Sequence, residues 1–389
     1  MKNILVCAVD YDIGSSGAYH FSHYILEIND ILNAPYRIWL LTDDLDENVG
    51  QRNKKTMAYI QKVPFDYPSW LFPFYHFLRN WAYYKAIRRF QKENTVDAVV
   101  FSQAFYGVLS RLLLPKGIKT AGIVHDAMSL TPQRNSHFSW KSYVFFSLTQ
   151  RPLEILANRW HDFTVANSRF IQSLILEKRQ LPNNRVPMIY QSMDVAKIPF
   201  YPRPWFYTEG DVIKILFVKS GFIGGGLQDL IEALGQLPYS FQLTIVGPPP
   251  YVHSIIEDWA APFSHIILRF CGRLTHSEVL ELMSNHHILS IPSRQEALGL
   301  ANIEGLAQGI SVVSTRVGGI PEVLGQGEFG WLAEATNTKS LATALKDCIE
   351  TDPSVRFSKS QKGRIHVEQL FTKEKMLADF LALFEKMTA

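Results

Sequence analysis

The sequence predicts an α/β fold of two doubly wound domains, each built on a parallel sheet that helices cover. Three observations predict it. Short buried-strand patterns alternate with helical patterns, a glycine-rich turn follows the first strand pattern of each half, and a proline-rich stretch (PFYPRP, 199–204) lies between the halves. Of the 389 residues, 47% are hydrophobic, which is enough apolar material for two cores.

The first half begins with an expected buried strand at residues 4–9. Glycines and serines at 14–17 form the turn after it, and a helical pattern starts at Tyr19. Further buried strands are expected at 37–41, 98–101, 120–124 and 163–166.

The second half repeats this order. An expected strand at 214–218 leads into a glycine-rich loop at 221–226 and a helix that begins at Leu227. A helix at 373–387 is expected to pack on either domain, and we place the domain boundary at 200/201. Further strands are expected at 242–246, 266–270, 287–291 and 311–314.

The composition excludes several classes of protein. Charged residues make up 19% of the chain and the formal net charge is +3, which speaks against disorder and against a nucleic-acid partner. No run approaches the roughly 18 apolar residues of a membrane-spanning helix. Asp10 and Asp12 interrupt the amino-terminal apolar run too early for a signal peptide. Because three dispersed cysteines favour a reducing compartment, we expect a cytoplasmic protein.

Residues that carry chemistry are expected beyond the carboxyl ends of the strands, where functional loops of parallel sheets lie. The segment EALGLANIE (296–304) follows the expected strand at 287–291. Gly299 permits a close approach, and the helix start after it offers free N–H groups to a phosphate oxygen. Glu296 and Glu304 could accept hydrogen bonds from hydroxyl groups on either side of that phosphate. Alone, such a pair is more often two exposed surface charges.

Four ordered motifs in the second half surround this pair. They are IVG (245–247), IPSRQEALGLANIEGLAQGISVVST (291–315), VGGIPEVL (317–324) and GWLAE (330–334). Together they resemble the carboxyl-terminal domain of the retaining glycosyltransferases of family 4, which have the GT-B fold. The resemblance implies two Rossmann-like domains facing a central cleft, an acceptor-binding domain at 1–200 and a nucleotide-sugar-binding domain at 201–389.

The same resemblance implies roles for individual residues. Glu304 would bind the ribose hydroxyls of a nucleotide, and Glu296 the donor sugar near O3. Leu300 and Ala301 would offer backbone amides to the diphosphate. The donor site would further include Gly247, Gly299, Arg273 and Arg294.

The first half resembles the family more loosely, but in the right order. The loop DYDIGSSGAYH (10–20) corresponds to the family's glycine-rich loop, which implies donor contacts for Gly14, Ser16 and Gly17. VHDAMS (124–129) matches a His-Asp motif. By resemblance His125 would be catalytic, contacting the sugar's C6 hydroxyl or stabilising positive character at the anomeric carbon. The alternative is a histidine satisfied in the core. VANSRF (165–170) and IYQSMDVAKI (189–198) match further elements.

One departure from the family concerns the leaving group. Family members usually place an Arg and a Lys in the loop after the first strand of the second domain, where this chain has Ser220 and Gly225. Losing both charges without replacement should slow the reaction by orders of magnitude. Lys219, expected to be catalytic, is the first candidate to replace them and Arg294 the second. Arg273 and a backbone-amide nest at residues 224–226 are further alternatives.

We expect no metal and no cofactor, the nucleotide-sugar being a substrate. The Asp-x-Asp pairs at 10–12 and 44–46 are a weak metal pattern, and GT-B enzymes generally handle the diphosphate without a divalent ion. His286 and His287 adjoin a strand, where successive side chains point to opposite faces. The two histidines therefore cannot easily bind the same metal ion. A dinucleotide oxidoreductase is disfavoured, because no G-x-G-x-x-G run precedes a ribose-binding acid at the usual distance.

A basic aromatic segment at residues 65–90 holds 11 of the chain's 49 aromatic residues. It allows three interpretations: a helix packed on the first sheet, a helix on an anionic membrane surface, or one side of a groove for a lipid-linked or polyhydroxylated acceptor. The membrane or acceptor interpretation depends on Trp70, Trp81, Arg88 and Arg89. The aromatic residues at helical spacing are Trp70, Phe74, Phe77, Trp81 and Tyr84.

These expectations describe a retaining, metal-independent hexosyltransferase. It would move a sugar from a UDP-sugar, or next a GDP-sugar, to a glycan or lipid-linked acceptor in cell-surface polysaccharide or glycolipid assembly, at the cytoplasmic face of a membrane. Two alternatives remain: a catalytically weak sugar-nucleotide-binding protein of the same fold, and an enzyme similar to glycogen synthase or phosphorylase.

Overall fold

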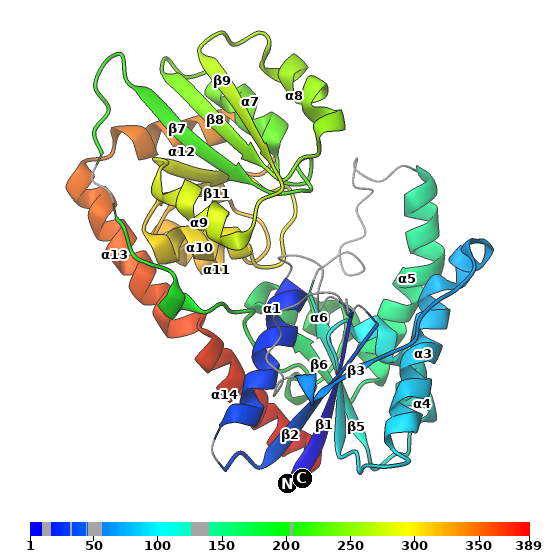
Figure 1. Cartoon of the computed structure of the whole chain (residues 1–389). Helices are drawn as coiled ribbons and strands as arrows, with labels where there is room; N and C mark the ends of the chain where they lie inside the picture. Colours follow the sequence, from blue (N-terminus) through cyan, green and yellow to red (C-terminus); the bar gives the residue numbers. More distant parts are fainter. Residues whose placement is uncertain (10–16, 32, 44, 46–56, 126–139, 203–204) are drawn as a thin grey trace. The chain divides into compact units, whose positions relative to one another are not determined.

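The computed structural model describes the whole chain except residues 10–16, 32, 44, 46–56, 126–139 and 203–204. The described residues form two compact units (Figure 1). Unit 1 comprises Met1–Ser192 and Lys373–Ala389, and unit 2 comprises Met193–Thr372. The boundary at 192/193 differs from the 200/201 of the sequence, because the segment that follows it is bonded to unit 2. The amide of Tyr201, for example, donates to the carbonyl of Gln308 over 2.8 Å.

Unit 1 is built on a parallel sheet in which the described strands follow the order β3-β2-β1-β4-β5-β6. The strands are β1 (Lys2–Ala8), β2 (Tyr36–Thr42), β3 (Ile60–Lys62), β4 (Ala98–Phe101), β5 (Lys119–Val124) and β6 (Phe163–Ala166). The α-helices are α1 (Gly17–Tyr24), α3 (Tyr75–Phe90), α4 (Val108–Leu113), α5 (Trp140–Trp160), α6 (Arg169–Arg179) and α14 (Lys373–Thr388). The 3₁₀ turns are η1 (Ile25–Asp30), η2 (Ser69–Phe74), η3 (Ala104–Gly107) and η4 (Asn183–Arg185).

Helices cover both faces of this sheet because its strands are apolar on both faces. Successive residues of β1 point to opposite sides. Ile4 and Val6 contribute to a core with α1 and α14, while Leu5 and Cys7 contribute to a core with α3. The continuous apolar run that predicts a buried strand therefore reflects two separate cores, one on each face.

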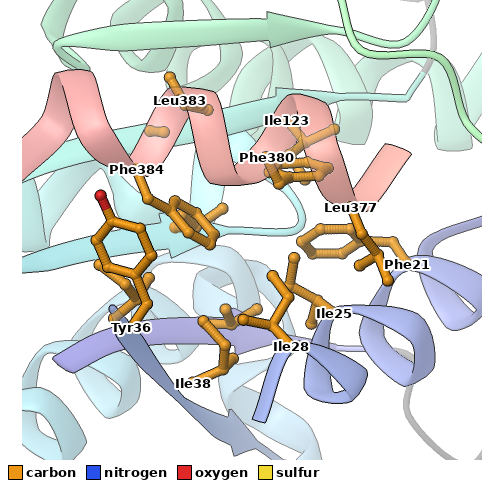
Figure 2. Packing of buried hydrophobic residues seen from close by; sticks show 14 of the residues in the cluster. Phe21, Ile25, Ile28, Tyr36, Ile38, Ile123, Leu377, Phe380, Leu383 and Phe384 are labelled. Atoms are coloured by element: carbon orange, nitrogen blue, oxygen red, sulfur yellow. The ribbon is translucent and has the colours of Figure 1, made fainter. Parts of the chain in front are cut away.

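The carboxyl-terminal helix α14 packs on unit 1, although it follows unit 2 in the chain. Figure 2 shows its buried apolar face against α1, η1 and the sheet. The rings of Phe380 and Phe21 lie 5.0 Å apart, and those of Phe384 and Tyr36 lie 5.6 Å apart. Of the two positions that the sequence allows for this helix, the structure has the one on the first domain.

Unit 2 repeats the architecture, with the described strands in the parallel order β12-β11-β10-β7-β8-β9. The strands are β7 (Val212–Val218), β8 (Ser240–Val246), β9 (Ile266–Gly272), β10 (Ile288–Ile291), β11 (Ser311–Thr315) and β12 (Trp331–Ala333). The α-helices are α7 (Leu227–Leu234), α8 (His253–Ala260), α9 (His276–Ser284), α10 (Leu300–Gln308), α11 (Ile320–Val323), α12 (Thr338–Glu350) and α13 (Pro353–Leu370). The 3₁₀ turns are η5 (Val195–Lys197), η6 (Pro250–Val252) and η7 (Gly325–Gly327). The two doubly wound parallel sheets that the sequence predicts are confirmed.

Candidate functional site

In unit 2, the loops that carry the predicted donor residues leave the same edge of the sheet, since all its strands are parallel and their carboxyl ends meet there. The loop after β7 contains Lys219, and the loop after β10 contains Arg294 and Glu296. These two loops are directly bonded, because the amide of Arg294 donates to the carbonyl of Gly224 over 2.9 Å. The edge therefore gathers most of the residues that the sequence assigns to a donor.

Lys219 and Glu296 form the central charged pair of this edge. The ammonium nitrogen of Lys219 lies 2.6 Å from Oε2 of Glu296 and 3.0 Å from the hydroxyl oxygen of Ser293. The Lys219 and Glu296 side chains keep 27% and 25% of their surface exposed. Both side chains are therefore accessible from solvent, and an ammonium group lies at the strand end where family members usually place an Arg and a Lys.

Two glycines allow the loops of this edge to approach so closely. Gly318 has φ +58°, and a Cβ at this position would lie 1.6 Å from the carbonyl oxygen of Glu296. Gly247 has φ +113°, and its Cβ would lie 2.7 Å from the amide nitrogen of Ser220. Any side chain would push the neighbouring loop away, because neither neighbour is a flexible side-chain end. The sequence assigns Gly247 to the donor site; the structure places it against the loop that carries Lys219.

Within the described part of the chain, no side-chain cap bonds the N-terminus of α10. Gly299 precedes the helix with φ +96°, a conformation that other residues rarely adopt. The first amides of an α-helix, here those of Leu300 and Ala301, have no partner within the helix. They carry the positive end of the helix dipole, which suits a phosphate group.

Glu304 lies on the second turn of α10, and the structure shows a partner for it that the sequence analysis missed. Nε2 of His276, the first residue of α9, lies 3.0 Å from Oε1 of Glu304. The hydrogen bond to Glu304 raises the pKa of His276. The Glu304 side chain is 12% exposed and that of His276 is 39% exposed. The two residues are 28 positions apart, so sequence spacing gave no sign of their contact.

Two of the alternatives for replacing the missing cations are weakened by the structure. Arg294 is held by both carboxylate oxygens of Asp229, over 2.8 and 2.7 Å, and this paired contact fixes its guanidinium more firmly than one carboxylate contact fixes the ammonium of Lys219. The nest expected at residues 224–226 is not open, because the amides of Gly225 and Gly226 donate within their own loop. Arg273 is exposed beyond β9. Lys219 keeps its place as the first candidate.

His125 in unit 1 follows β5 directly. Its ring nitrogens are buried, and neither has a hydrogen-bond partner of normal geometry among the described residues. Burial lowers the pKa of His125 to about 4, so the imidazole is neutral at pH 7. A buried imidazole without such partners among the described residues is a site candidate. Of the other predicted residues, Gly17 begins α1, whereas Gly14 and Ser16 lie outside the described residues.

The basic aromatic segment forms η2 and α3, but it buries a different face from the one that the aromatic spacing predicts. The helix turns Asn80, Tyr83, Ile87 and Phe90 into the core. Phe77 and Trp81 are 56% and 40% exposed. The interpretation in which the aromatic stripe packs on the first sheet is therefore wrong for Phe77 and Trp81. Arg88 and Arg89 are exposed, and the side chain of Trp70 lies outside what the structure describes.

Metal binding and membrane spanning both depend on how the described residues are arranged. In that part of the chain no group of three or more His, Cys, Asp and Glu side chains is arranged to hold a metal ion. No described helix combines the length and apolar character needed to span a bilayer.

Comparison with known proteins shows the family to which the sequence belongs. Residues 207–364 match the model of the "Glycosyl transferases group 1", and residues 32–197 match that of "Glycosyltransferase Family 4". Over all of this chain and 99% of the other, the fold is similar to sucrose-phosphate synthase from Thermosynechococcus elongatus (TM-score 0.78, 17% identity). It is also similar to Anabaena HepE in complex with UDP-glucose (TM-score 0.71, 15% identity, covering 99% of this chain and 100% of that one). The fold is that of the GT-B glycosyltransferases.

The chain belongs to the group 1 glycosyltransferases of family 4. It is 26% identical to N-acetyl-alpha-D-glucosaminyl L-malate synthase of Bacillus anthracis, over 54% of this chain and 57% of that protein. It is also 26% identical to an uncharacterised glycosyltransferase of Methanocaldococcus jannaschii, over 58% of this chain and 60% of that protein. The matches span about 60% or less of the length of these curated relatives.

Proposed function

We propose that this protein is a retaining glycosyltransferase that moves a sugar from a UDP-sugar to an acceptor hydroxyl, with a GDP-sugar as the next candidate donor. The observation that carries the proposal is the Lys219–Glu296 pair on the loops that end β7 and β10, in the unit where α10 presents its N-terminus. The family match supports transfer as the activity. The similar fold of Anabaena HepE, whose structure contains UDP-glucose, supports the choice of donor.

In this proposal each group of unit 2 has one task. The amides of Leu300 and Ala301 bind the diphosphate, and Glu304 accepts hydrogen bonds from the ribose hydroxyls. Glu296 accepts from the donor sugar near O3. Lys219 balances the charge that develops on the diphosphate as it leaves, which is the task of the Arg and Lys in related chains.

The bond changes involve no protein nucleophile. The bond between the anomeric carbon and the diphosphate oxygen breaks, and the acceptor oxygen attacks from the same face. The acceptor proton passes to a diphosphate oxygen, so the nucleoside diphosphate leaves with the bond electrons and the configuration is retained. His125, neutral because of its burial, accepts from or donates to the transferred sugar and does not act as a cation.

We further propose that the acceptor is a glycan or a lipid-linked sugar, and that the protein associates peripherally with an anionic membrane surface. The support lies on α3 and the residue before it. Phe74, Phe77 and Trp81 are 58%, 56% and 40% exposed, and Arg88 and Arg89 are exposed near the end of the same helix. Exposed aromatic and basic side chains together are typical of helices that lie on membranes.

The proposal is tested by incubating the protein with UDP-glucose, UDP-galactose, UDP-N-acetylglucosamine and GDP-mannose, with methyl glycosides as acceptors and with or without EDTA. We expect release of nucleoside diphosphate above the buffer rate from at least one donor, and equal release with EDTA present. Glu296→Gln should abolish it. If no donor turns over although UDP binds, the catalytically weak binding protein is the better description. Orthophosphate release with an α-linked product, when glucose 1-phosphate is supplied as the donor, would instead indicate a phosphorylase-type reaction.

A further inference from the structure

Unit 1 contains a buried ion pair at the carboxyl edge of its sheet that the proposed reaction does not yet use. Asp43 follows the last residue of β2, and its carboxylate accepts from Nε of Arg79 on α3 over 2.6 Å. The side chains are 2% and 16% exposed. Tyr83 bonds the second carboxylate oxygen over 3.0 Å. Burying such a pair is costly unless it has further partners, which Tyr83 supplies here, and the carboxyl edge of a parallel sheet is where functional loops usually lie.

Aromatic rings surround the guanidinium of Arg79. Its carbon lies 5.0 Å from the ring centre of Phe65, 4.8 Å from that of Tyr75 and 5.1 Å from that of Tyr106. Phe65 and Tyr75 are half-buried, and Tyr67 touches both at 5.2 and 5.4 Å between ring centres. The rings therefore hold the guanidinium on several sides and still offer surface to solvent.

Arg79 retains hydrogen-bonding capacity. Nε donates to Asp43, and Nη1 donates to the hydroxyl of Tyr106 over 3.1 Å. Within the described part of the chain, Nη2 makes no hydrogen bond. A guanidinium held in a fixed orientation with donors to spare is a recognition group for planar or paired oxygen atoms.

The charges around Arg79 favour a neutral ligand. Asp43 balances the guanidinium, and burial lowers the pKa of the neighbouring His76 to about 4, so this imidazole is uncharged at neutral pH. Nδ1 of His76 lies 3.2 Å from the Tyr106 hydroxyl and shares in the same network. With no net positive charge, the cluster is better suited to hydroxyl groups than to a phosphate.

We propose that Phe65, Tyr75 and Arg79 form the subsite that binds a sugar ring of the acceptor. The C–H groups on one face of a pyranose are weakly positive and stack on the electron-rich faces of aromatic rings, while Arg79 donates to hydroxyls at the ring edge. The inference rests on the proposed function, since a transferase needs an acceptor. It assigns recognition of the acceptor's sugar ring to named residues of unit 1.

The test is saturation-transfer NMR on the full chain in the presence of UDP. The probes are methyl α- and β-glycosides of glucose, galactose, mannose and N-acetylglucosamine, with glycerol and inorganic phosphate as probes that are not sugars. We expect at least one glycoside to receive saturation at its ring C–H protons. Tyr75→Leu and Arg79→Lys should weaken its binding at least about tenfold, through lost stacking and lost charged hydrogen bonds.

Trp160→Leu is the matched control, because Trp160 is an aromatic residue of the same unit that is 38% exposed, at the end of α5. It should change glycoside binding less than twofold. UDP affinity should be equal in all variants, and this equality also shows that each variant is folded. If Arg79→Lys is unstable, Tyr75→Leu alone still tests the subsite. The inference is overturned if UDP binds but no glycoside does, if phosphate binds in place of the glycosides, or if both variants bind the glycoside normally. Failure of both UDP and GDP to bind would contradict the proposed function instead.

Discussion

The ammonium of Lys219 and the carboxylate of Glu296 lie 2.6 Å apart at the carboxyl edge of the unit 2 sheet. The ammonium also donates a hydrogen bond to the hydroxyl oxygen of Ser293 over 3.0 Å. Lys219→Met removes the positive charge while keeping most of the side-chain volume. We expect the transfer rate to fall by about a hundredfold to a thousandfold, as for loss of one group that stabilises developing negative charge. The rate of UDP release from the best donor measures this.

Lys214→Met is the control for this change, since Lys214 is an exposed lysine within β7, on the strand that leads to Lys219. It should leave the rate unchanged. Full activity of Lys219→Met would mean that another group, such as Arg273, stabilises the diphosphate.

The His276–Glu304 pair predicts a pH dependence of stability. The pKa of His276 is raised by its hydrogen bond to Glu304, so the folded protein holds this proton more tightly than the unfolded chain does. The contribution is complete below pH 6.5 and is lost as the pH rises through the raised value. Because His276 is 39% exposed, it should stay below about 1 kcal/mol. Urea unfolding from pH 5.5 to 8.5 measures it.

His276→Asn removes this titration and keeps a polar side chain. The difference in unfolding free energy between wild type and variant should be greatest at pH 5.5 and shrink towards pH 8.5. A difference that is constant across this range would show that the pair does not titrate as described.

A second pH prediction concerns His125, whose burial lowers its pKa to about 4. The neutral imidazole persists from pH 7 to about pH 5, so turnover should show no acid limb near pH 6.5 that belongs to this residue. His125→Asn should lower turnover at least about a hundredfold with UDP affinity retained, if the ring acts on the transferred sugar. Steady-state kinetics from pH 5 to 8 with UDP titration measures both. Normal turnover in the variant would return His125 to the role of a core residue.

The two described strands that the sequence misses lie at sheet edges, although the strands at the opposite edges, β6 and β9, are predicted. β3 and β12 have three residues each and end their sheets. In β3 only Ile60 is buried, while Gln61 and Lys62 are exposed. A strand that pairs on one side and buries one residue leaves no apolar run to recognise, whereas 98–101 is buried throughout.

The residues of the candidate site likewise fall into two groups, those that are close together in the sequence and those that only the fold brings into contact. Glu296, Gly299 and Glu304 lie within one short segment, so the family resemblance of that segment is enough to propose them as site residues. The Asp43–Arg79 and His276–Glu304 pairs join residues from different elements, and only the fold shows these contacts. The helical spacing of aromatic residues on α3 misleads for a related reason. Asn80 is buried because it bonds the carbonyl of Phe105 over 2.9 Å, a polar contact that hydrophobic spacing does not reveal.

Membrane association is predicted from the exposed basic end of α3. Arg88→Glu with Arg89→Glu should sharply reduce sedimentation with phosphatidylserine vesicles at low salt, since each basic residue near such a surface contributes about 1 kcal/mol. Lys116→Glu with Lys178→Glu makes the same change of charge at exposed positions elsewhere in unit 1 and should have a smaller effect. Wild-type protein that does not sediment with these vesicles would end the membrane proposal.

Binding of UDP by wild type and Glu304→Ala, followed by isothermal titration calorimetry, tests whether the edge around α10 is the nucleotide site. We expect wild type to bind UDP and Glu304→Ala to bind it about 1 to 3 kcal/mol more weakly, because charged hydrogen bonds to the ribose are lost. Glu257→Ala, which changes an exposed glutamate of α8, should bind as wild type does. Equal UDP affinity in wild type and Glu304→Ala, or no binding of UDP or GDP to the wild type, would contradict the assignment.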